Sequence, residues 1–409
     1  MSEAYSPGGN GQFRSVDLGR GTSPSGVRLY NERLVLSLVR KHRSLPKAEI
    51  ARLTGLSAQT ASVIMNRLEA DGLVRKGKRQ RGRIGQPSVP FSLNPEGAFA
   101  FGLKIGRRSA DLVLIDFQGT VRNRLHMTYA YPLPSTLLAF AVDGVSRMEA
   151  DMPPGPRSRI VGVGLGSPDE LWNWAYEVGA PPGTLDAWRD FDLRAEFQAS
   201  LGHQVYLCND ATAACAAELV FGKHEDILDF LYIFIGSFVG GGLVLNRMLV
   251  PGRSGKAAAL GSMPVPDANG AVHQLIHSAS LYQLEARLTA AGKAAGWLWA
   301  DPDAWRTAES ELDDWIIEAA SSLAFAVTAA SSVMDFQAVV LDGAFPDQVR
   351  TRLVAALTER ITHYDRQGLG PIRILPGTIG AAAREVGAGS LPLIANFAAD
   401  REVLFKEMT

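Results

Sequence analysis

The sequence predicts an α/β protein in which a winged helix-turn-helix at the N-terminus precedes a larger two-lobed body. Three observations predict this fold class. A basic segment lies near the N-terminus, glycine and proline divide that segment into short helices and a ribbon, and strands alternate with helices in the rest of the chain. We therefore expect a disordered tail over 1–26, a basic domain over 27–93 and a body over 94–409.

Charge separates the basic domain from the body. Residues 27–93 contain 14 Lys and Arg against 4 Asp and Glu, whereas residues 94–409 contain 25 basic and 36 acidic side chains. The formal net charge of −1 for the whole chain hides this asymmetry. A basic module on an acidic body predicts that only the first part binds a polyanion.

The basic domain has the spacing of a helix-turn-helix. Apolar residues recur at helical intervals after Asn31, which we expect to cap the first helix, and a short second helix follows Pro46. Gly55 supplies the left-handed backbone that the turn between helices needs, and Ser57 is a suitable N-cap for the third helix. The dipeptide Asp71-Gly72 ends that helix.

The third helix and a basic ribbon after it predict a double-stranded DNA partner. Ala61, Ile64 and Leu68 face inward, and Gln59 on the opposite face can pair bidentately with adenine. Residues 75–87 form a glycine-punctuated wing whose arginines suit a narrow A·T-rich minor groove, with a return strand over 89–93. The alternatives are a solvated charge run or a winged helix that contacts protein. The predicted DNA-binding residues are Ser57, Gln59, Thr60, Ser62, Asn66, Arg67, Lys78, Arg79, Arg81, Arg83 and Gln86.

Composition limits what the remaining chain can be. With 409 residues, 46% of them apolar, the chain is long enough for two or three domains and a large core. We expect no membrane span and no secretory signal, and hence a cytoplasmic protein. Cys208 and Cys215 give neither a disulfide framework nor a cysteine-based metal site.

The body is expected to alternate strands and helices in two similar halves with a cleft between them. A hairpin is predicted over 98–116, and a glycine-rich loop is predicted over 236–242. Further strands are expected over 160–165, 205–207, 230–235, 243–245 and 338–341, and helices from Ala211 and over about 308–334.

At this point the chain resembles the ROK family, which contains repressors and sugar kinases on the actin-like ATPase fold. The resemblance covers about residues 28–390 and implies that fold for the body. It is carried, in family order, by AEIARLTGLSAQTASVIMNRLEADGLV (48–74), GRIGQP (82–87), FGLKIG (101–106), GVGLGSP (162–168), AWRDFDL (187–193), LCNDATAACAAELVFG (207–222) and FIGSFVGGGLVLN (234–246).

The departures from the family pattern argue against phosphoryl transfer. A kinase of this family needs an acidic residue in the first phosphate loop to hold Mg²⁺, and Lys104 stands there, followed by Arg107 and Arg108. Asp210 aligns with the family's general base, but it has no phosphoryl donor to work with. We therefore expect no catalytic residue, no enzymatic activity and no cofactor.

The family's zinc motif is also altered. Where the resemblance implies a glutamate and a histidine, this chain has Ala259 and Ser262, and no cysteine follows. His273 and His277 stand four residues apart, as on one face of a helix, but two ligands without a third do not make a zinc cage. We expect no metal.

The resemblance implies a small effector such as a sugar or sugar derivative in the cleft, held by Asn209, Asp210 and Gln274. The alternative for Asp210 is that it only caps the helix that begins at Ala211. Four aromatic residues lie near the expected rim and are expected to belong mainly to the core, with stacking on a sugar face as the alternative: Trp172, Trp174, Tyr176 and Trp188.

These observations predict a sequence-specific DNA-binding transcription regulator, in particular a repressor of carbohydrate-related genes. It is expected to bind an inverted-repeat operator as a homodimer formed by the body, and a sugar or sugar derivative in the cleft is expected to change its affinity for DNA. Two alternatives remain at this level: a ROK sugar kinase with an accessory DNA-binding domain, and a ligand-independent DNA-binding dimer with a vestigial pocket.

Overall fold

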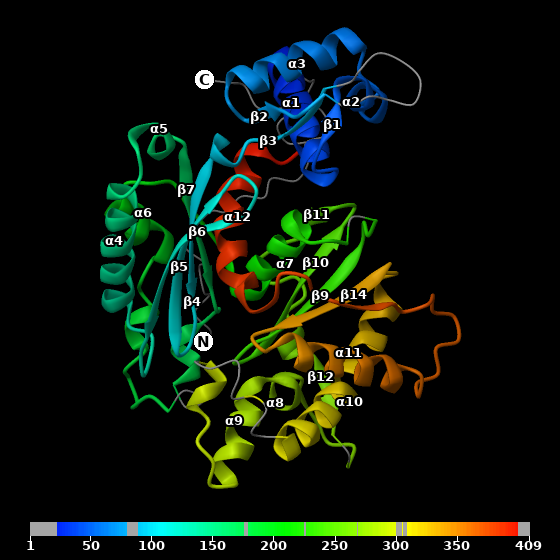
Figure 1. Cartoon of the computed structure of the whole chain (residues 1–409). Helices are drawn as coiled ribbons and strands as arrows, with labels where there is room; N and C mark the ends of the chain where they lie inside the picture. Colours follow the sequence, from blue (N-terminus) through cyan, green and yellow to red (C-terminus); the bar gives the residue numbers. More distant parts are fainter. Residues whose placement is uncertain are drawn as a thin grey trace, which may run out of the picture.

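The computed structural model describes residues 23–79, 89–175, 179–224, 226–267, 269–299, 305 and 309–399. Within these residues a small helical module lies beside a body of two lobes, each built on its own sheet (Figure 1). The α/β fold class with an N-terminal winged helix-turn-helix and a two-lobed, actin-like body is confirmed.

The N-terminal helix-turn-helix module follows the predicted order. It contains α1 (Pro24–Lys41), β1 (Leu45–Pro46), α2 (Lys47–Thr54), α3 (Ala58–Ala70), β2 (Val74–Lys76) and β3 (Pro90–Leu93), with the strands in the order β1-β3-β2. Gly55 ends α2 with a φ of 70°, and Gly72 follows α3 with a φ of 73°. The expected cap at Asn31 is wrong, because α1 begins three residues inside the expected tail and Ser23 caps it, accepting a hydrogen bond from the Gly26 amide.

The first lobe is a sheet in the order β6-β5-β4-β7-β8. Its central strands are buried, and β4 and β5 form the predicted hairpin. The strands are β4 (Phe99–Ile105), β5 (Ser109–Asp116), β6 (Val121–Thr128), β7 (Ile160–Ser167) and β8 (Val205–Asn209), and the helices around them are α4 (Pro134–Ala150), α5 (Pro154–Arg157) and α6 (Leu193–Leu201). Short 3-10 helices occur at η1 (Pro95–Gly97), η2 (Leu171–Trp174) and η3 (Asp186–Trp188).

The second lobe is a sheet in the order β11-β10-β9-β14-β15, with a separate hairpin of β12 and β13. Its strands are β9 (Phe230–Ile235), β10 (Val239–Leu245), β11 (Met248–Leu249), β12 (Pro264–Pro266), β13 (Val272–Gln274), β14 (Ala338–Gly343) and β15 (Ile374–Pro376). Its helices are η4 (Leu260–Ser262), α8 (Ile276–Ala279), α9 (Leu281–Ala290), η5 (Gly296–Trp299), α10 (Glu309–Val333), α11 (Asp347–Ile361) and η7 (Gly380–Ala382).

The glycine-rich loop predicted over 236–242 is shorter in the structure. Val239 to Gly242 belong to β10, and only the turn before Val239 is a loop. A Cβ on Gly240 would lie 2.7 Å from the Ala211 Cβ, and one on Gly242 would lie 2.3 Å from the Cys215 Cβ. These glycines therefore let a helix pack closely on the strand.

Two helices, α7 (Asp210–Phe221) and α12 (Ala383–Phe397), pack against each other between the lobes (Figure 1). A Cβ on Gly387 would lie 1.8 Å from the Ala213 carbonyl oxygen, and one on Gly164 would lie 1.7 Å from the Ala388 carbonyl oxygen. Since backbones touch directly at these positions, α12 is locked against both α7 and β7.

One described helical segment, Ser310–Val333 within α10, is long and apolar enough to cross a membrane by length and composition alone. In the structure α10 packs against α8, α9 and α11. Trp315, Leu323 and Val327 are fully buried in the core of the second lobe, so the folded protein uses this segment as a core helix.

Candidate DNA-binding surface and interlobe site

Helix α3 presents the predicted recognition face to solvent. Ser57 caps the helix by accepting a hydrogen bond from the Thr60 amide at 3.1 Å, while Ile64 and Leu68 on the inner face are buried. Gln59 and Thr60 are exposed. Val63 on the same outer face is 62% exposed, an apolar contact suited to a thymine methyl group that the sequence analysis did not assign.

Polar contacts orient the rest of this face. Lys47 on α2 donates hydrogen bonds to the Asn66 Oδ1 at 2.6 Å and the Ser62 Oγ at 3.3 Å, so it joins α2 to the outer face of α3. Arg67 lies 3.4 Å from Glu32 of α1 and 3.8 Å from Asp71. These contacts hold Arg67 beside α1, at the edge of the recognition face.

The wing is described only in part. Lys78 and Arg79 are exposed after β2. Arg81, Arg83 and Gln86 lie outside the described residues.

An interlobe cavity of about 200 Å³ lies where β8 ends and α7 begins. Asn209 and Asp210 line it from this junction, and Asp169 and Trp174 line it from the segment after β7. The second lobe closes it with Phe238, Gly240, Gly241, Lys256, Ala259 and Ser262.

Asn209 and Asp210 both support the helix start and face the cavity. The Asn209 Oδ1 and the Asp210 Oδ1 each accept a hydrogen bond from the Ala211 amide at 3.0 Å. The Asn209 side chain also donates to the Asp169 Oδ2 at 3.3 Å, and the Arg384 guanidinium donates to the Asp210 Oδ2 at 3.3 Å. Asp210 can therefore cap helix α7 and line the cavity at the same time.

Gln274 does not join this pair. It is exposed on β13, where it pairs with Pro264, and it is not among the described residues that line the cavity. The prediction placed it by its position in a motif, but the β12–β13 hairpin carries it away. Ile276, two residues later, lines the cavity instead.

The sequence analysis missed Asp169, which lines the cavity, and Arg384, which contacts Asp210 but is not among the described lining residues. Burial, together with the nearby Asp210 and Glu170 carboxylates, raises the pKa of Asp169, and Lys256 and the Asn209 hydrogen bond oppose that shift. A signal for Asp169 was present, since it lies two residues after the end of the glycine-rich strand β7. Arg384 comes from α12, far away in sequence, and nothing local indicated it.

In the segment that stands in the place of the first phosphate loop, Lys104 and Arg107 occupy the space. The Lys104 Nζ is buried and lies 3.1 Å from the Asp111 Oδ2 and 2.9 Å from the Ser109 Oγ. The Arg107 guanidinium carbon lies 3.4 Å from the Phe238 ring centroid and 5.1 Å from that of Trp174. Arg107 therefore stacks on the aromatic wall of the cavity and bridges the two lobes.

The prediction that His273 and His277 share one helix face is wrong. His273 lies in β13 and His277 in α8, where its Nδ1 is 2.7 Å from the Tyr282 hydroxyl. Among the described residues, no group of three or more His, Cys, Asp or Glu side chains is placed to hold a metal.

The aromatic residues divide between core and cavity. Trp188 is buried and donates to the Pro132 carbonyl, as expected of a core residue. Trp172 packs at the edge of the first-lobe core, whereas Trp174 lines the cavity. Tyr176 lies outside the described residues.

Two protein-family models and several known proteins match parts of this chain. Residues 100–279 match the model of the ROK family, and residues 28–75 match a winged helix-turn-helix DNA-binding model. An uncharacterised protein, y4fQ, of Sinorhizobium fredii is 25% identical over 90% of this chain and 91% of its own length. The xylose repressor of Bacillus spizizenii is 26% identical over 60% of this chain and 62% of its own length.

A solved structure shares the fold. The crystal structure of a ROK family transcriptional regulator, described as a homologue of the Escherichia coli MLC protein, aligns with a TM-score of 0.64 and 17% identity. The alignment covers 93% of this chain and 99% of that chain, so the likeness includes both the module and the two lobes.

Proposed function

Because the chain carries a ROK family domain behind an N-terminal winged helix-turn-helix DNA-binding domain, we propose that it is a sequence-specific transcription regulator. We propose further that it represses carbohydrate-related genes in the cytoplasm, binds an inverted-repeat operator as a homodimer, and responds to a sugar or sugar derivative in the interlobe cavity. The observation that carries this proposal is the exposed recognition face of α3, with Gln59 at its start. The xylose-repressor relative supports the repressor role.

The interlobe cavity suits a neutral hydroxylated ligand. Asn209, Asp210 and Asp169 offer amide and carboxylate groups to hydroxyls, and Trp174 with Phe238 offers aromatic faces to a sugar ring. Phosphoryl transfer is disfavoured because Lys104 holds the position of an Mg²⁺-binding carboxylate and ion-pairs with Asp111. We therefore infer a binding protein, with the kinase alternative set aside.

Helix α12 offers a physical route between the cavity and the DNA-binding module. At its start, Arg384 contacts Asp210 in the cavity. At its end, Phe397 packs edge-on against Phe117, and the Ala399 amide donates to the Ser37 Oγ of α1 at 3.3 Å. Glycine contacts lock α12 to α7 and to β7 of the first lobe, and α7 in turn packs on β10 of the second lobe. A change of lobe angle on ligand binding would therefore move α1 and with it α3.

One observation favours the ligand-independent alternative. Arg107 stacks on Phe238 and occupies aromatic surface that a sugar would use. A ligand must displace this side chain or bind beside it. The alternative predicts no thermal shift with any sugar.

The test is operator selection from random DNA followed by binding with full-length protein and with residues 94–409 alone. We expect an inverted repeat, and salt-sensitive binding that the truncated body lacks because the module supplies the phosphate contacts. Binding by the truncated body would contradict the proposal.

A further inference from the structure

On the outer face of α3, a cation from another helix fixes the side chain of Asn66. Lys47, the first residue of α2, donates hydrogen bonds to the Asn66 Oδ1 at 2.6 Å and to the Ser62 Oγ at 3.3 Å. Its ammonium also lies 5.5 Å from the centroid of the Phe91 ring in β3. From these contacts we propose that Lys47 and Asn66 form one base-reading unit that selects guanine in the major groove, an inference that rests on the DNA-binding function proposed above.

Asn66 stands where a recognition helix reads bases. Gln59, Val63 and Asn66 recur at intervals of four and three residues, so they share one face of α3, and all three are exposed. Seven residues of helix rise by about 10 Å, so Gln59 and Asn66 face different base pairs. The base that Asn66 reads is therefore separate from the adenine that Gln59 is expected to contact.

The hydrogen bond from Lys47 decides what Asn66 can offer to DNA. An asparagine reads adenine through two contacts, one accepted by its Oδ1 and one donated by its Nδ2. Here the Oδ1 already accepts from the ammonium, and the adenine amino group would have to approach the same oxygen beside a positive charge. Asn66 therefore offers the groove its Nδ2 amide, which is a donor.

Lys47 adds a second donor to the unit. An ammonium carries three hydrogens, and the contacts with Asn66 and Ser62 use two of them. Both partners are neutral, so they do not neutralise the charge of Lys47, whereas Lys76 in the same module lies 2.8 Å from a carboxylate oxygen of Glu69. Guanine presents two acceptors and no donor in the major groove, while adenine and cytosine each present an amino donor. A unit that offers only donors therefore matches guanine.

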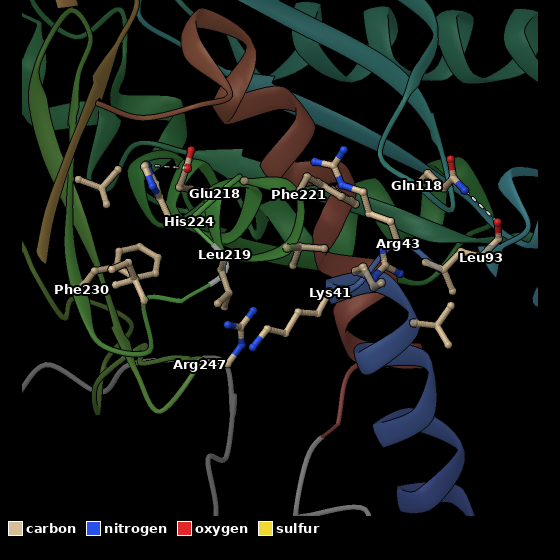
Figure 2. A pocket seen from close by; sticks show the side chains of 16 residues that line it. Lys41, Arg43, Leu93, Gln118, Glu218, Leu219, Phe221, His224, Phe230 and Arg247 are labelled. Atoms are coloured by element: carbon tan, nitrogen blue, oxygen red, sulfur yellow. Dashed lines mark hydrogen bonds and ion pairs between the residues drawn. The ribbon is translucent and has the colours of Figure 1, made fainter. Parts of the chain in front are cut away.

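The body leaves this face of the module open. Helix α1 contacts the body, since the Arg40 guanidinium donates to the Phe117 carbonyl at 2.9 Å. Figure 2 shows the end of α1, with Lys41, beside Phe221 of α7 at a cavity between the module and the body. Helix α3 lies at the edge of the module away from the lobes (Figure 1). The base-reading unit is therefore on a face that DNA can approach.

The test measures base preference at every position of an operator selected from random DNA, with the full-length protein. We expect the wild type to prefer guanine over adenine by about tenfold or more at one position of each half-site. Lys47→Met should reduce that preference to about threefold or less, because Asn66 regains the acceptor that adenine needs. Asn66→Ala should weaken the guanine preference at the same position, because the two side chains act together.

A base analogue and a matched variant sharpen the test. Replacing that guanine by 7-deazaguanine removes the N7 acceptor, and it should weaken binding by the wild type more than binding by Lys47→Met. Arg52 lies on the same helix but pairs with Glu49, so Arg52→Met is the control and should keep the guanine preference. Thermal unfolding should show Lys47→Met folded, with a melting temperature near that of the wild type, since methionine is a good helix former.

The outcomes separate this inference from the proposed function. An operator whose base preferences do not change in Lys47→Met would overturn the inference and leave the DNA-binding function standing. The inference would also be overturned if Lys47→Met weakened binding equally on every sequence and lowered its salt dependence, because Lys47 would then contact only phosphate. Failure of the wild type to select any operator would contradict the proposed function, and this inference with it.

Discussion

The Asp210 carboxylate lies 3.3 Å from the guanidinium of Arg384, which is the second residue of α12. Both side chains are largely buried, with exposed fractions of 14% and 11%. The pair connects the helix start that lines the interlobe cavity to the helix that reaches the DNA-binding module. A ligand hydroxyl that competes for Asp210 would therefore change the contact that holds the start of α12.

The first prediction concerns this pair. Asp210→Ala should abolish the thermal shift produced by a stabilising sugar, because the carboxylate is lost from the cavity. It should also lower the free energy of unfolding by about 1–3 kcal/mol, since it removes a hydrogen bond between charged groups from Arg384. Helix α7 should persist, because Asn209 caps it as well.

The measurement is a thermal-shift screen of sugars and polyols on both proteins, with circular dichroism to check folding. Asp210→Asn is the conservative control that retains an acceptor for Arg384. If Asp210→Ala responds to the ligand as the wild type does, the effector pocket lies elsewhere.

The second prediction concerns base recognition. Gln59→Ala should relax base preference at one position of each half-site and weaken operator binding by about 1–3 kcal/mol, because a bidentate contact to a base is lost. Competition binding against single-base operator variants measures this. Arg52, an exposed residue of α2 paired with Glu49, supplies a control, and Arg52→Ala should keep base preference unchanged. Equal losses on every sequence for Gln59→Ala would show that Gln59 contacts only the backbone.

The sequence predicted the module well because its signals are local. Helix spacing, the left-handed Gly55 and the Ser57 cap each depend on neighbouring residues. The cavity was predicted less completely, because it depends on contacts between segments far apart in sequence. Asn209 and Asp210 stand at a strand end and line the cavity as the sequence indicated, and their binding of a ligand stays a prediction, whereas Arg384 approaches from α12. The glycines of β10 were predicted to lie in a loop, although in this fold they belong to a strand and accommodate Ala211 and Cys215.

The third prediction concerns the buried pair in the position of the first phosphate loop. Lys104→Ala should destabilise the protein by about 3–5 kcal/mol, because it leaves Asp111 buried without its cation. Arg147→Ala breaks an exposed helical pair with Asp143 and should cost about 0.5 kcal/mol or less. Urea unfolding of the two variants measures the difference. Similar small losses for both would show that His126, 2.7 Å from the other Asp111 oxygen, compensates for Lys104.

The fourth prediction concerns pH. Burial raises the pKa of Asp169 above its ordinary value of 3.8, so the native state binds a proton more readily than the unfolded state. The resulting stabilisation is complete below the ordinary value and is lost as pH rises through the raised one. Asp169→Asn should therefore gain stability relative to the wild type as pH rises. Thermal unfolding from acidic to neutral pH measures this, with the exposed Asp190→Asn as a control expected to follow the wild type. If the difference in stability between Asp169→Asn and the wild type does not change with pH, this carboxylate is not desolvated.

The fifth prediction concerns Arg107, which decides whether the interlobe cavity is usable. Its guanidinium lies over Phe238 and beside Trp174, on the surface where a sugar ring would stack. Arg107→Ala should open that surface. Sugar binding should become tighter by about 5- to 30-fold, because removing a cation–π contact worth about 1–2 kcal/mol lowers the cost of displacement.

Isothermal titration of xylose into wild type and Arg107→Ala tests this directly. The neighbouring Arg108 donates to the Ala130 carbonyl and is not among the cavity-lining residues, so Arg108→Ala is the matched control and should bind like the wild type. Weaker binding by Arg107→Ala would mean that the guanidinium contacts the ligand itself. If neither protein binds xylose or responds to any sugar in the thermal-shift screen while both bind the operator, the ligand-independent alternative is correct and Arg107 closes a vestigial pocket.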